Sequence, residues 1–265
     1  MLAILPVVAD KVSLRYGTVP QAEVERRLNA FEDSNSKREA KLKVLFEEAG
    51  CSGDQLSEQK VPHASAPNVV CTLPGEVDSE IVVGGHFDFV NSGKGVVDNW
   101  SGCSLLPSLY QSVKAVPRRH QFVFIGFTDE EKGLVGSKFY VHKLSKEELA
   151  RISGMVNLDT LGLSSTKVEL DGADKKMAHA LAAIADTLKL PVDVVNVHKV
   201  GRSDSDSFQD RKVPSISIHS LTQETLRILH SPKDQMEAMQ INDYYNTYLL
   251  MRAYLMYLDQ VLPAD

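Results

Sequence analysis

The sequence predicts a single α/β domain built around buried, parallel strands. Three short apolar runs, rich in β-branched and aromatic residues, occupy 79–85, 122–127 and 154–159. Such runs are typical of strands that are covered on both faces of a parallel sheet. Segments with helical spacing lie between them, as expected for an α/β fold. The length of 265 residues, with 43% hydrophobic and 24% charged residues, is normal for one such domain.

Residues 1–67 are expected to form a mostly helical N-terminal part of this domain. Apolar positions at helical spacing predict a helix over 18–31, with Pro20 in its first turn. A second helix is predicted over 36–49, ended by Gly50, with its basic residues on a solvated face. The first nine residues, MLAILPVVA, fit either the tail of an export signal without its basic start or a buried segment. An exported protein, periplasmic or secreted, is slightly favoured over a cytoplasmic one.

The remaining chain alternates between strands and helices, without an internal repeat or linker. Strands are predicted at 68–73, 79–85, 122–127, 154–159, 167–170, 192–197 and 214–219, with 167–170 the more exposed one. Helices are predicted from about 105 to 113, at 134–144, 145–152, 175–188 and 242–261, with a polar loop at 201–208 before a short helix. Ser145 and Glu148 form a capping-box pattern at the start of the 145–152 helix.

Three of the buried strands lead to residues that can bind metal ions. His86 directly follows the first, Glu130 and Glu131 come shortly after the second, and Asp159 ends the third. The carboxyl ends of parallel strands meet at one edge of a sheet, where ligands bind. Asp98 and His230 lie on loops that can return to the same edge. Imidazole and carboxylate groups without cysteine suit a catalytic zinc, cobalt or manganese site.

Each of these motifs also has an ordinary structural interpretation when taken alone. The Asp129-Glu130-Glu131 run could be a solvated acidic loop, and Asp98 could simply cap the helix that follows it. His86 and Asp88 share one face of an extended segment, an arrangement in which a carboxylate can orient a metal-bound imidazole. It is the combination of the motifs that predicts a metal site.

Charge, apolar run length and cysteine spacing argue against several other classes of protein. The formal net charge of −6, without a basic stripe, argues against a nucleic-acid partner. No apolar run reaches the roughly 18 residues that a membrane-spanning helix needs. Cys51, Cys71 and Cys103 have no CxxC spacing, which leaves either one disulfide with a free thiol or three thiols.

From about residue 68 to the C-terminus, the chain resembles the di-zinc exopeptidases, the family of bacterial leucyl aminopeptidases, glutamate carboxypeptidases and glutaminyl cyclases. The resemblance is carried, in order, by HFD at His86, DNWSG at Asp98, DEEKGLVGS at Asp129, NLD ending at Asp159, SDSDSF at Ser203 and HSPKD at His230. It implies a mixed, mainly parallel sheet of eight strands flanked by helices, and a cis peptide bond after Asp98. The chain departs from the family pattern at Trp100, where a small residue is usual, and at Ser205, where histidine is common.

The resemblance also implies a role for each candidate residue. His86 and Asp159 would bind one zinc ion, Glu131 and His230 would bind a second, and Asp98 would bridge the two ions. Glu130 would be the general base, because a carboxylate that does not coordinate metal keeps its basicity, and Asp88 would orient His86. Trp100 and Phe208 are possible walls of the substrate pocket.

The leading functional hypothesis is therefore an aminopeptidase that carries two Zn²⁺ per chain and acts on peptides with a free N-terminus. The alternatives are a glutaminyl cyclase, which uses one zinc, a carboxypeptidase with Arg202 as its only nearby carboxylate-binding cation, and an inactive binding domain. The preferred N-terminal residue and the oligomeric state are left open by the sequence.

Overall fold

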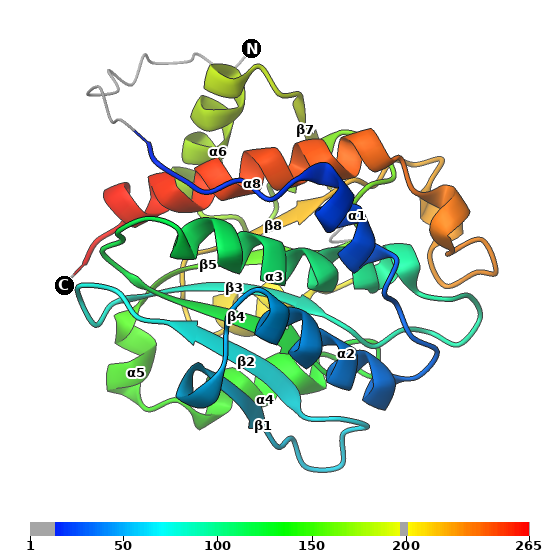
Figure 1. The fold of residues 1–265 in the computed structure, drawn as a ribbon, viewed down its shortest axis with the longest axis horizontal. Helices are drawn as coiled ribbons and strands as arrows, with labels where there is room; N and C mark the ends of the chain where they lie inside the picture. Colours follow the sequence, from blue (N-terminus) through cyan, green and yellow to red (C-terminus); the bar gives the residue numbers. More distant parts are fainter. Residues whose placement is uncertain (1–13, 197–200, 265) are drawn as a thin grey trace.

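Eight strands form one mixed sheet through the middle of the molecule (Figure 1). The computed structural model describes residues 14–196 and 201–264. The strands are β1 (Leu56–Gln59), β2 (Asn68–Leu73), β3 (Glu80–His86), β4 (Gln121–Phe127), β5 (Ile152–Leu158), β6 (Thr166–Glu169), β7 (Val192–Val195) and β8 (Ser215–His219). Their order in the sheet is β1-β2-β4-β3-β5-β8-β6-β7. The central strands β4, β3, β5 and β8 run parallel, whereas β1, β2 and the β6–β8 pair contribute antiparallel contacts. The expected mixed, mainly parallel sheet is confirmed.

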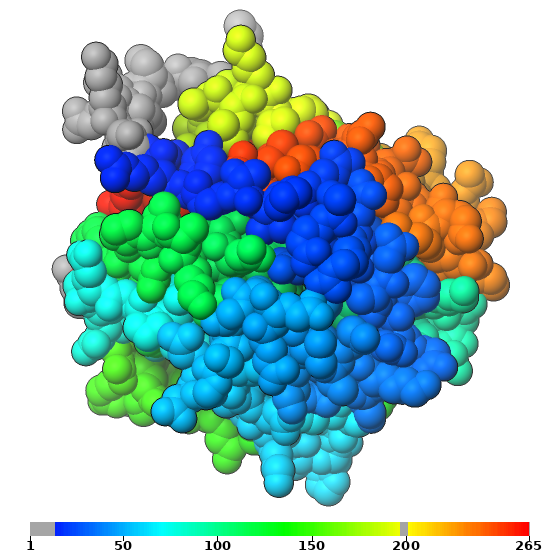
Figure 2. Space-filling model, viewed as in Figure 1, coloured from blue at the N-terminus to red at the C-terminus, as the bar shows by residue number. Residues whose placement is uncertain are grey.

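Helices cover both faces of this sheet. They are α1 (Gln21–Leu28), α2 (Asn35–Glu48), α3 (Ser101–Lys114), α4 (Val135–Lys143), α5 (Lys146–Arg151), α6 (Lys175–Leu188), α7 (Asp204–Gln209) and α8 (Ile241–Val261). Figure 1 looks onto the face that carries α1, α2, α3 and α8, and Figure 2 shows the blue N-terminal residues lying across that face. The apolar side chains of α4 and α7 belong to the cluster on the opposite face.

Successive side chains of the central strands enter different cores, because residues on a strand alternate between its two faces. In β4, Phe122 and Phe124 pack in the core beneath α2 and α3, whereas Val123, Ile125 and Phe127 belong to the smaller core beneath α4 and α7. Both faces of β4 are therefore apolar, which explains why this strand appears in the sequence as an unbroken apolar run.

Most element predictions are confirmed, and three need correction. The strand at 68–73, the helix at 175–188 and the capping box of Ser145 and Glu148 occur as predicted. β1 was not predicted, because its sequence LSEQ is polar and lies at an exposed edge. The predicted loop at 201–208 is wrong in its second half, since α7 begins at Asp204. The backbone N–H of Ser203, which precedes the helix, donates a hydrogen bond to the Asp206 carboxylate. Val197, the last residue of the predicted 192–197 strand, lies outside the described residues.

The prediction that 167–170 is a more exposed strand is also wrong. All four residues of β6 are buried, and only Leu170, which follows the strand, is exposed. β6 lies between β8 and β7, and its Val168 packs in the core that α8 covers. Its polar residues Lys167 and Glu169 suggested a solvated strand, but tertiary packing encloses them.

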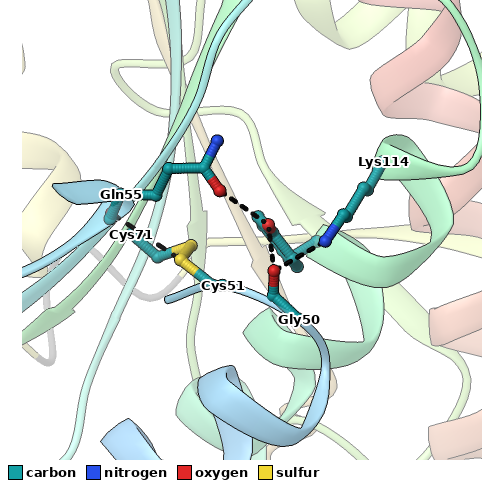
Figure 3. The surroundings of a disulfide bond; sticks show 6 residues. Gly50, Cys51, Gln55, Cys71 and Lys114 are labelled. Atoms are coloured by element: carbon teal, nitrogen blue, oxygen red, sulfur yellow. Dashed lines mark hydrogen bonds between the residues drawn. A yellow bond between two sulfur atoms is a disulfide. The ribbon is translucent and has the colours of Figure 1, made fainter. Parts of the chain in front are cut away.

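A disulfide between Cys51 and Cys71 ties the segment after α2 to β2, and Cys103 is a buried free cysteine (Figure 3). The neighbouring Gly50 adopts a left-handed conformation with φ of 91°, which ends α2 as predicted. Its carbonyl oxygen accepts hydrogen bonds from Lys114 and from the Tyr110 hydroxyl, both on α3. The N-terminal helices are thus fixed to the sheet and to α3.

No helix within the described ranges is both long and apolar enough to cross a bilayer.

Asp259 of α8 fixes the turn that leads into β4. Its buried carboxylate accepts hydrogen bonds from the backbone N–H of Arg119 at 3.0 Å and from that of His120 at 2.9 Å. We expect Asp259→Ala to lower the free energy of unfolding by about 1–3 kcal/mol, because it leaves these N–H groups without a partner. Gln260→Ala, at the exposed neighbouring position, is the matched control and should change stability by less than about 0.5 kcal/mol. Urea denaturation measures both, and equal effects would contradict the proposed role of Asp259.

Candidate active site

The candidate ligand residues meet at one edge of the sheet. His86 is the last residue of β3, Asp159 directly follows β5, and Glu131 lies in the turn after β4. Asp98 precedes α3, and His230 lies in the long connection between β8 and α8. Together with Glu130, these residues line one cavity of about 330 Å³, and Asp88 lies directly behind it.

The five side chains form two groups that share Asp98. His86, Asp98 and Asp159 make one group, and Asp98, Glu131 and His230 make the other, with the ligand atoms of each group within 4.8 Å of one another. Asp98 presents a different oxygen to each group. Its Oδ1 lies 3.3 Å from Nε2 of His86, and its Oδ2 lies 3.2 Å from Nε2 of His230.

The donor atoms of each group are of the kind that binds zinc. Each group contains one imidazole nitrogen and carboxylate oxygens, which are zinc ligands, and neither contains a thiolate that would close the site. Oε2 of Glu131 lies 3.0 Å from Nε2 of His230. The other oxygen of Glu131 is buried and has no hydrogen-bond partner among the described residues. A cation between these groups would satisfy atoms that the protein leaves unpaired.

Glu130 is close to the two groups but belongs to neither. Its Oε2 lies 3.9 Å from Nε2 of His86, and its side chain lines the cavity beside that of Glu131. Two adjacent glutamates therefore occupy different positions: one is in a ligand group and the other is next to it. This is the separation that a non-coordinating base requires.

Asp88 contacts both His86 and the Glu130–Glu131 turn. Nδ1 of His86 lies 3.4 Å from the Asp88 carboxylate and 3.2 Å from the Asp88 carbonyl oxygen. The same carboxylate accepts hydrogen bonds from the backbone N–H groups of Glu130 at 2.9 Å and Glu131 at 3.1 Å. Asp88 thus fixes the position of the turn as well as lying behind the imidazole, a second contact that HxD spacing did not indicate.

Three residues that hold the Asp98 segment were not identified from the sequence. The peptide bond from Asp98 to Asn99 is cis, as the resemblance implied. The Asn99 amide donates to the Leu158 carbonyl and accepts from the N–H groups of Gly102 and Thr160. The carboxylate of Asp234 accepts from the N–H groups of Val97 and Asp98. Asn99 lies in the DNWSG motif and Asp234 in the HSPKD motif, so the motifs could have pointed to both residues.

Arg38 is the third residue that holds the Asp98 segment, and no sequence motif includes it. It lies in α2, whose basic residues were predicted to face solvent, yet it is fully buried. Its guanidinium donates to the carbonyl oxygens of Phe87, Gly95 and Lys94, which belong to the segments that carry His86 and Asp98. It also lies 4.1 Å from the centre of the Phe89 ring. Nothing in the sequence distinguishes Arg38 from the exposed basic residues of the same helix.

The predicted pocket walls are wrong. Trp100 is fully buried beneath α1, where its indole N–H donates to the carbonyl oxygen of Arg27 at 3.3 Å. Phe208 is also fully buried and packs against Phe127 and Tyr140. Neither lines the cavity, and Ser205, the other departure from the family pattern, is buried beside Ser203. Arg202 lines the cavity, but its guanidinium pairs with carboxylates of its own segment, those of Asp206 and Asp210.

Burial and crowding of acids give the site unusual protonation behaviour. Burial raises the pKa of Glu130 to about 10, opposed by the charge of His86 and reinforced by that of Asp204. Burial and the nearby Asp98 raise the pKa of Glu131 to about 7. Burial would also raise the pKa of Asp98, but its contacts with His230 and His86 outweigh burial and hold that pKa well below its ordinary value. The crowded acids therefore favour the uptake of protons or of metal cations.

We expect the metal-free protein to lose stability as the pH rises from about 5 to about 7. The Glu131 pKa rises on folding from 4.5 to about 7, so the folded chain binds more protons than the unfolded chain across this window. Thermal unfolding after chelation measures the effect, and added zinc should reverse it. Glu131→Gln, which cannot ionise, should reduce the slope. The expectation would be contradicted if the unfolding temperature of the metal-free protein did not fall across this window. It would also be contradicted if the unfolding temperature depended on pH equally in wild type and variant.

The chain is similar in sequence to known peptidases. Residues 68–255 match Peptidase family M28. The chain is 31% identical over 166 residues to Aminopeptidase YwaD of Bacillus subtilis, a match that covers 59% of this chain and 36% of that protein. The chain therefore spans little more than a third of the length of this relative.

Two solved structures share the fold. The zinc aminopeptidase BSAP from Bacillus subtilis superposes with a TM-score of 0.67 and 25% identity, over 74% of this chain and 50% of that chain. A glutaminyl cyclase from an Acidobacteriales bacterium superposes with a TM-score of 0.72 and 16% identity, over 95% of this chain and 99% of that chain. The second likeness shows the fold alone. By its matched sequence motifs and its fold, the chain belongs to peptidase family M28.

Proposed function

We propose that the protein is a zinc aminopeptidase that removes the N-terminal residue of peptides. The observation that carries the proposal is the sharing of Asp98 between two ligand groups, with the non-ligand Glu130 beside them. The match to Aminopeptidase YwaD and the likeness to a zinc aminopeptidase support the metal and the reaction class. The substrate is a peptide with a free α-amine, which the acids lining the cavity would attract.

Two zinc ions per chain are proposed, with His86 and Asp159 holding one, Glu131 and His230 holding the other, and Asp98 bridging them. When bound, the ions would lower the pKa of a coordinated water molecule and polarise the scissile carbonyl. Their positive charge would also favour the ionised form of Glu130, whose pKa is raised in the metal-free site.

Glu130 would then act as the general base. Its carboxylate would accept a proton from the attacking water and deliver it to the amine that leaves. Asp88 would act as a positioning residue, because it holds the backbone N–H groups of Glu130 and Glu131 as well as contacting His86. The position of the base relative to the ligands would thus depend on one buried carboxylate.

A glutaminyl cyclase is the second candidate, since a cyclase of this fold has nearly the same extent as this chain. Two complete ligand groups favour hydrolysis, because activation of water benefits from a second cation. The carboxypeptidase hypothesis is weaker, because Arg202, which would have to bind the substrate's carboxylate, is already paired with Asp206 and Asp210. The complete ligand set also argues against an inactive binding domain.

Export from the cytoplasm is proposed as well. The disulfide between Cys51 and Cys71 supports it, because disulfides persist mainly in oxidising compartments.

The two adjacent glutamates provide a test of the proposed roles. Glu130→Gln should lower kcat by about 10²–10⁴-fold, because it removes only the base, and should keep close to two zinc ions per chain. Glu131→Gln should weaken one of the two metal sites. Metal analysis of protein purified without chelator, combined with turnover measurements, checks both variants. Near wild-type turnover by Glu130→Gln, or a single zinc ion in fully active wild type, would contradict the assignment.

The reaction class is tested with aminoacyl 4-nitroanilides, their N-acetylated forms and a peptide with N-terminal glutamine. An aminopeptidase should release nitroaniline only from substrates with a free α-amine, since that amine has to bind the acidic site. Release of ammonia with formation of pyroglutamate, and no amide hydrolysis, would establish the cyclase instead.

A further inference from the structure

The cavity contains a second polar pair besides the candidate ligands. Glu169, the last residue of β6, and His219, the last residue of β8, both line it. His219 lies opposite Lys167 in the antiparallel β6–β8 pair. Because side chains alternate along a strand, Glu169 lies on the same face of this pair as His219. The pair therefore lines the same cavity as the candidate ligands but belongs to two other strands, β6 and β8.

This pair lies next to the candidate metal site. β8 runs parallel to β5, with Leu158 opposite Ile218, and the N–H of Asp159 donates to the Ile218 carbonyl at 3.0 Å. His219 and Asp159 are therefore neighbours at the edge of the sheet. A substrate bound at Asp159 would extend part of itself toward Glu169 and His219.

Both side chains are buried, and the described part of the chain provides neither with a hydrogen bond. Glu169 is 7% exposed and His219 is 3% exposed. Oε1 of Glu169 and both ring nitrogens of His219 have no hydrogen-bond partner among the described residues. The approach between them, 3.8 Å from Nε2 to Oε2, is too long for a hydrogen bond. Buried polar groups are almost always paired, so these atoms are available to hydrogen-bond a molecule that enters the cavity.

The surrounding wall is apolar. Leu221, Leu226 and Leu229 line the same cavity. A group that fills this region would contact leucine side chains and, at its end, a carboxylate and an imidazole. The carboxylate is an acceptor, and an imidazole carries at least one N–H donor in either protonation state. The complementary group both donates and accepts hydrogen bonds.

We propose that Glu169 and His219 form a specificity subsite that selects an uncharged polar side chain, a carboxamide, on the N-terminal residue of the substrate. The inference rests on the proposed aminopeptidase activity and adds its substrate class. An aliphatic side chain would leave the buried carboxylate and imidazole unpaired, whereas a carboxamide satisfies both. A site that hydrogen-bonds its substrate rejects the analogue that lacks the polar group far more strongly than it rejects a missing methylene.

Asparaginyl and leucyl 4-nitroanilides test the subsite because their side chains have nearly the same shape. The wild-type enzyme should hydrolyse the asparaginyl substrate with a kcat/KM at least about tenfold above that of the leucyl substrate. The aspartyl substrate, of the same shape but without a donor, should be poorer than the asparaginyl one because Glu169 repels it.

Two variants separate this subsite from a structural role. Glu169→Met, an apolar residue of similar length, should reverse the preference toward leucine. Glu169→Gln, whose amide oxygen still accepts a hydrogen bond, should keep the preference for asparagine. Thermal unfolding of both variants shows whether they are folded. If neither variant folds, the comparison of the three substrates in the wild-type enzyme still tests the subsite.

The outcomes are distinguishable. A wild-type preference for the leucyl substrate, or an unchanged asparagine-to-leucine ratio in folded Glu169→Met, would overturn the subsite while leaving the aminopeptidase intact. A preference for the aspartyl substrate would also overturn the subsite. It would indicate that Arg202 or Lys138, which also line the cavity, binds the substrate side chain. Absence of nitroaniline from every substrate would instead overturn the proposed function, and the subsite with it.

Discussion

One carboxylate, Asp98, connects the two halves of the candidate active site, and the rest of the site depends on where it lies. Its two oxygens face two different imidazoles, at 3.3 Å from His86 and 3.2 Å from His230. His86 comes from the sheet, whereas His230 comes from a loop more than a hundred residues further along the chain. If Asp98 moved by even one ångström, one of the two groups would lose its shared ligand, because contacts of this kind depend steeply on distance.

The surrounding structure therefore fixes Asp98 from several directions. Asp234, in the same loop as His230, receives the N–H groups of Val97 and Asp98. Asn99 bonds to the ends of β5 and α3. Arg38 reaches from the N-terminal helices to the carbonyl oxygens of the same segment, and burial lowers its pKa only to about 10, so it stays charged at neutral pH. A buried cation is costly without partners, but these carbonyl oxygens supply them. The part of the chain outside the family match thus helps to hold the part inside it.

The same edge of the sheet carries two chemical functions side by side. The groups around Asp98 contain crowded acids that favour cations, whereas Glu169 and His219 offer an acceptor and a donor to a substrate side chain. Asp159, His219 and Glu169 lie at the ends of β5, β8 and β6, which are neighbours in the sheet. Binding and reaction can be tuned separately here, because the residues come from different strands but share one cavity.

The sequence by itself determined the fold class and the candidate metal ligands. Local patterns carried that information: unbroken apolar runs mark strands buried on both faces, and the residues that follow them, such as His86 and Asp159, must meet at one sheet edge. Family motifs supplied Asp98 and His230, whose loops no periodicity could place.

Only the tertiary structure decided which ordinary-looking residues matter. Arg38 and Glu169 occupy segments whose composition suggests a solvated surface, and both are buried because elements distant in sequence cover them. Trp100 and Phe208 suggested pocket walls by their size, but packing places them in the core. Burial and pairing depend on contacts between segments far apart in the chain, and a local sequence pattern does not record those contacts.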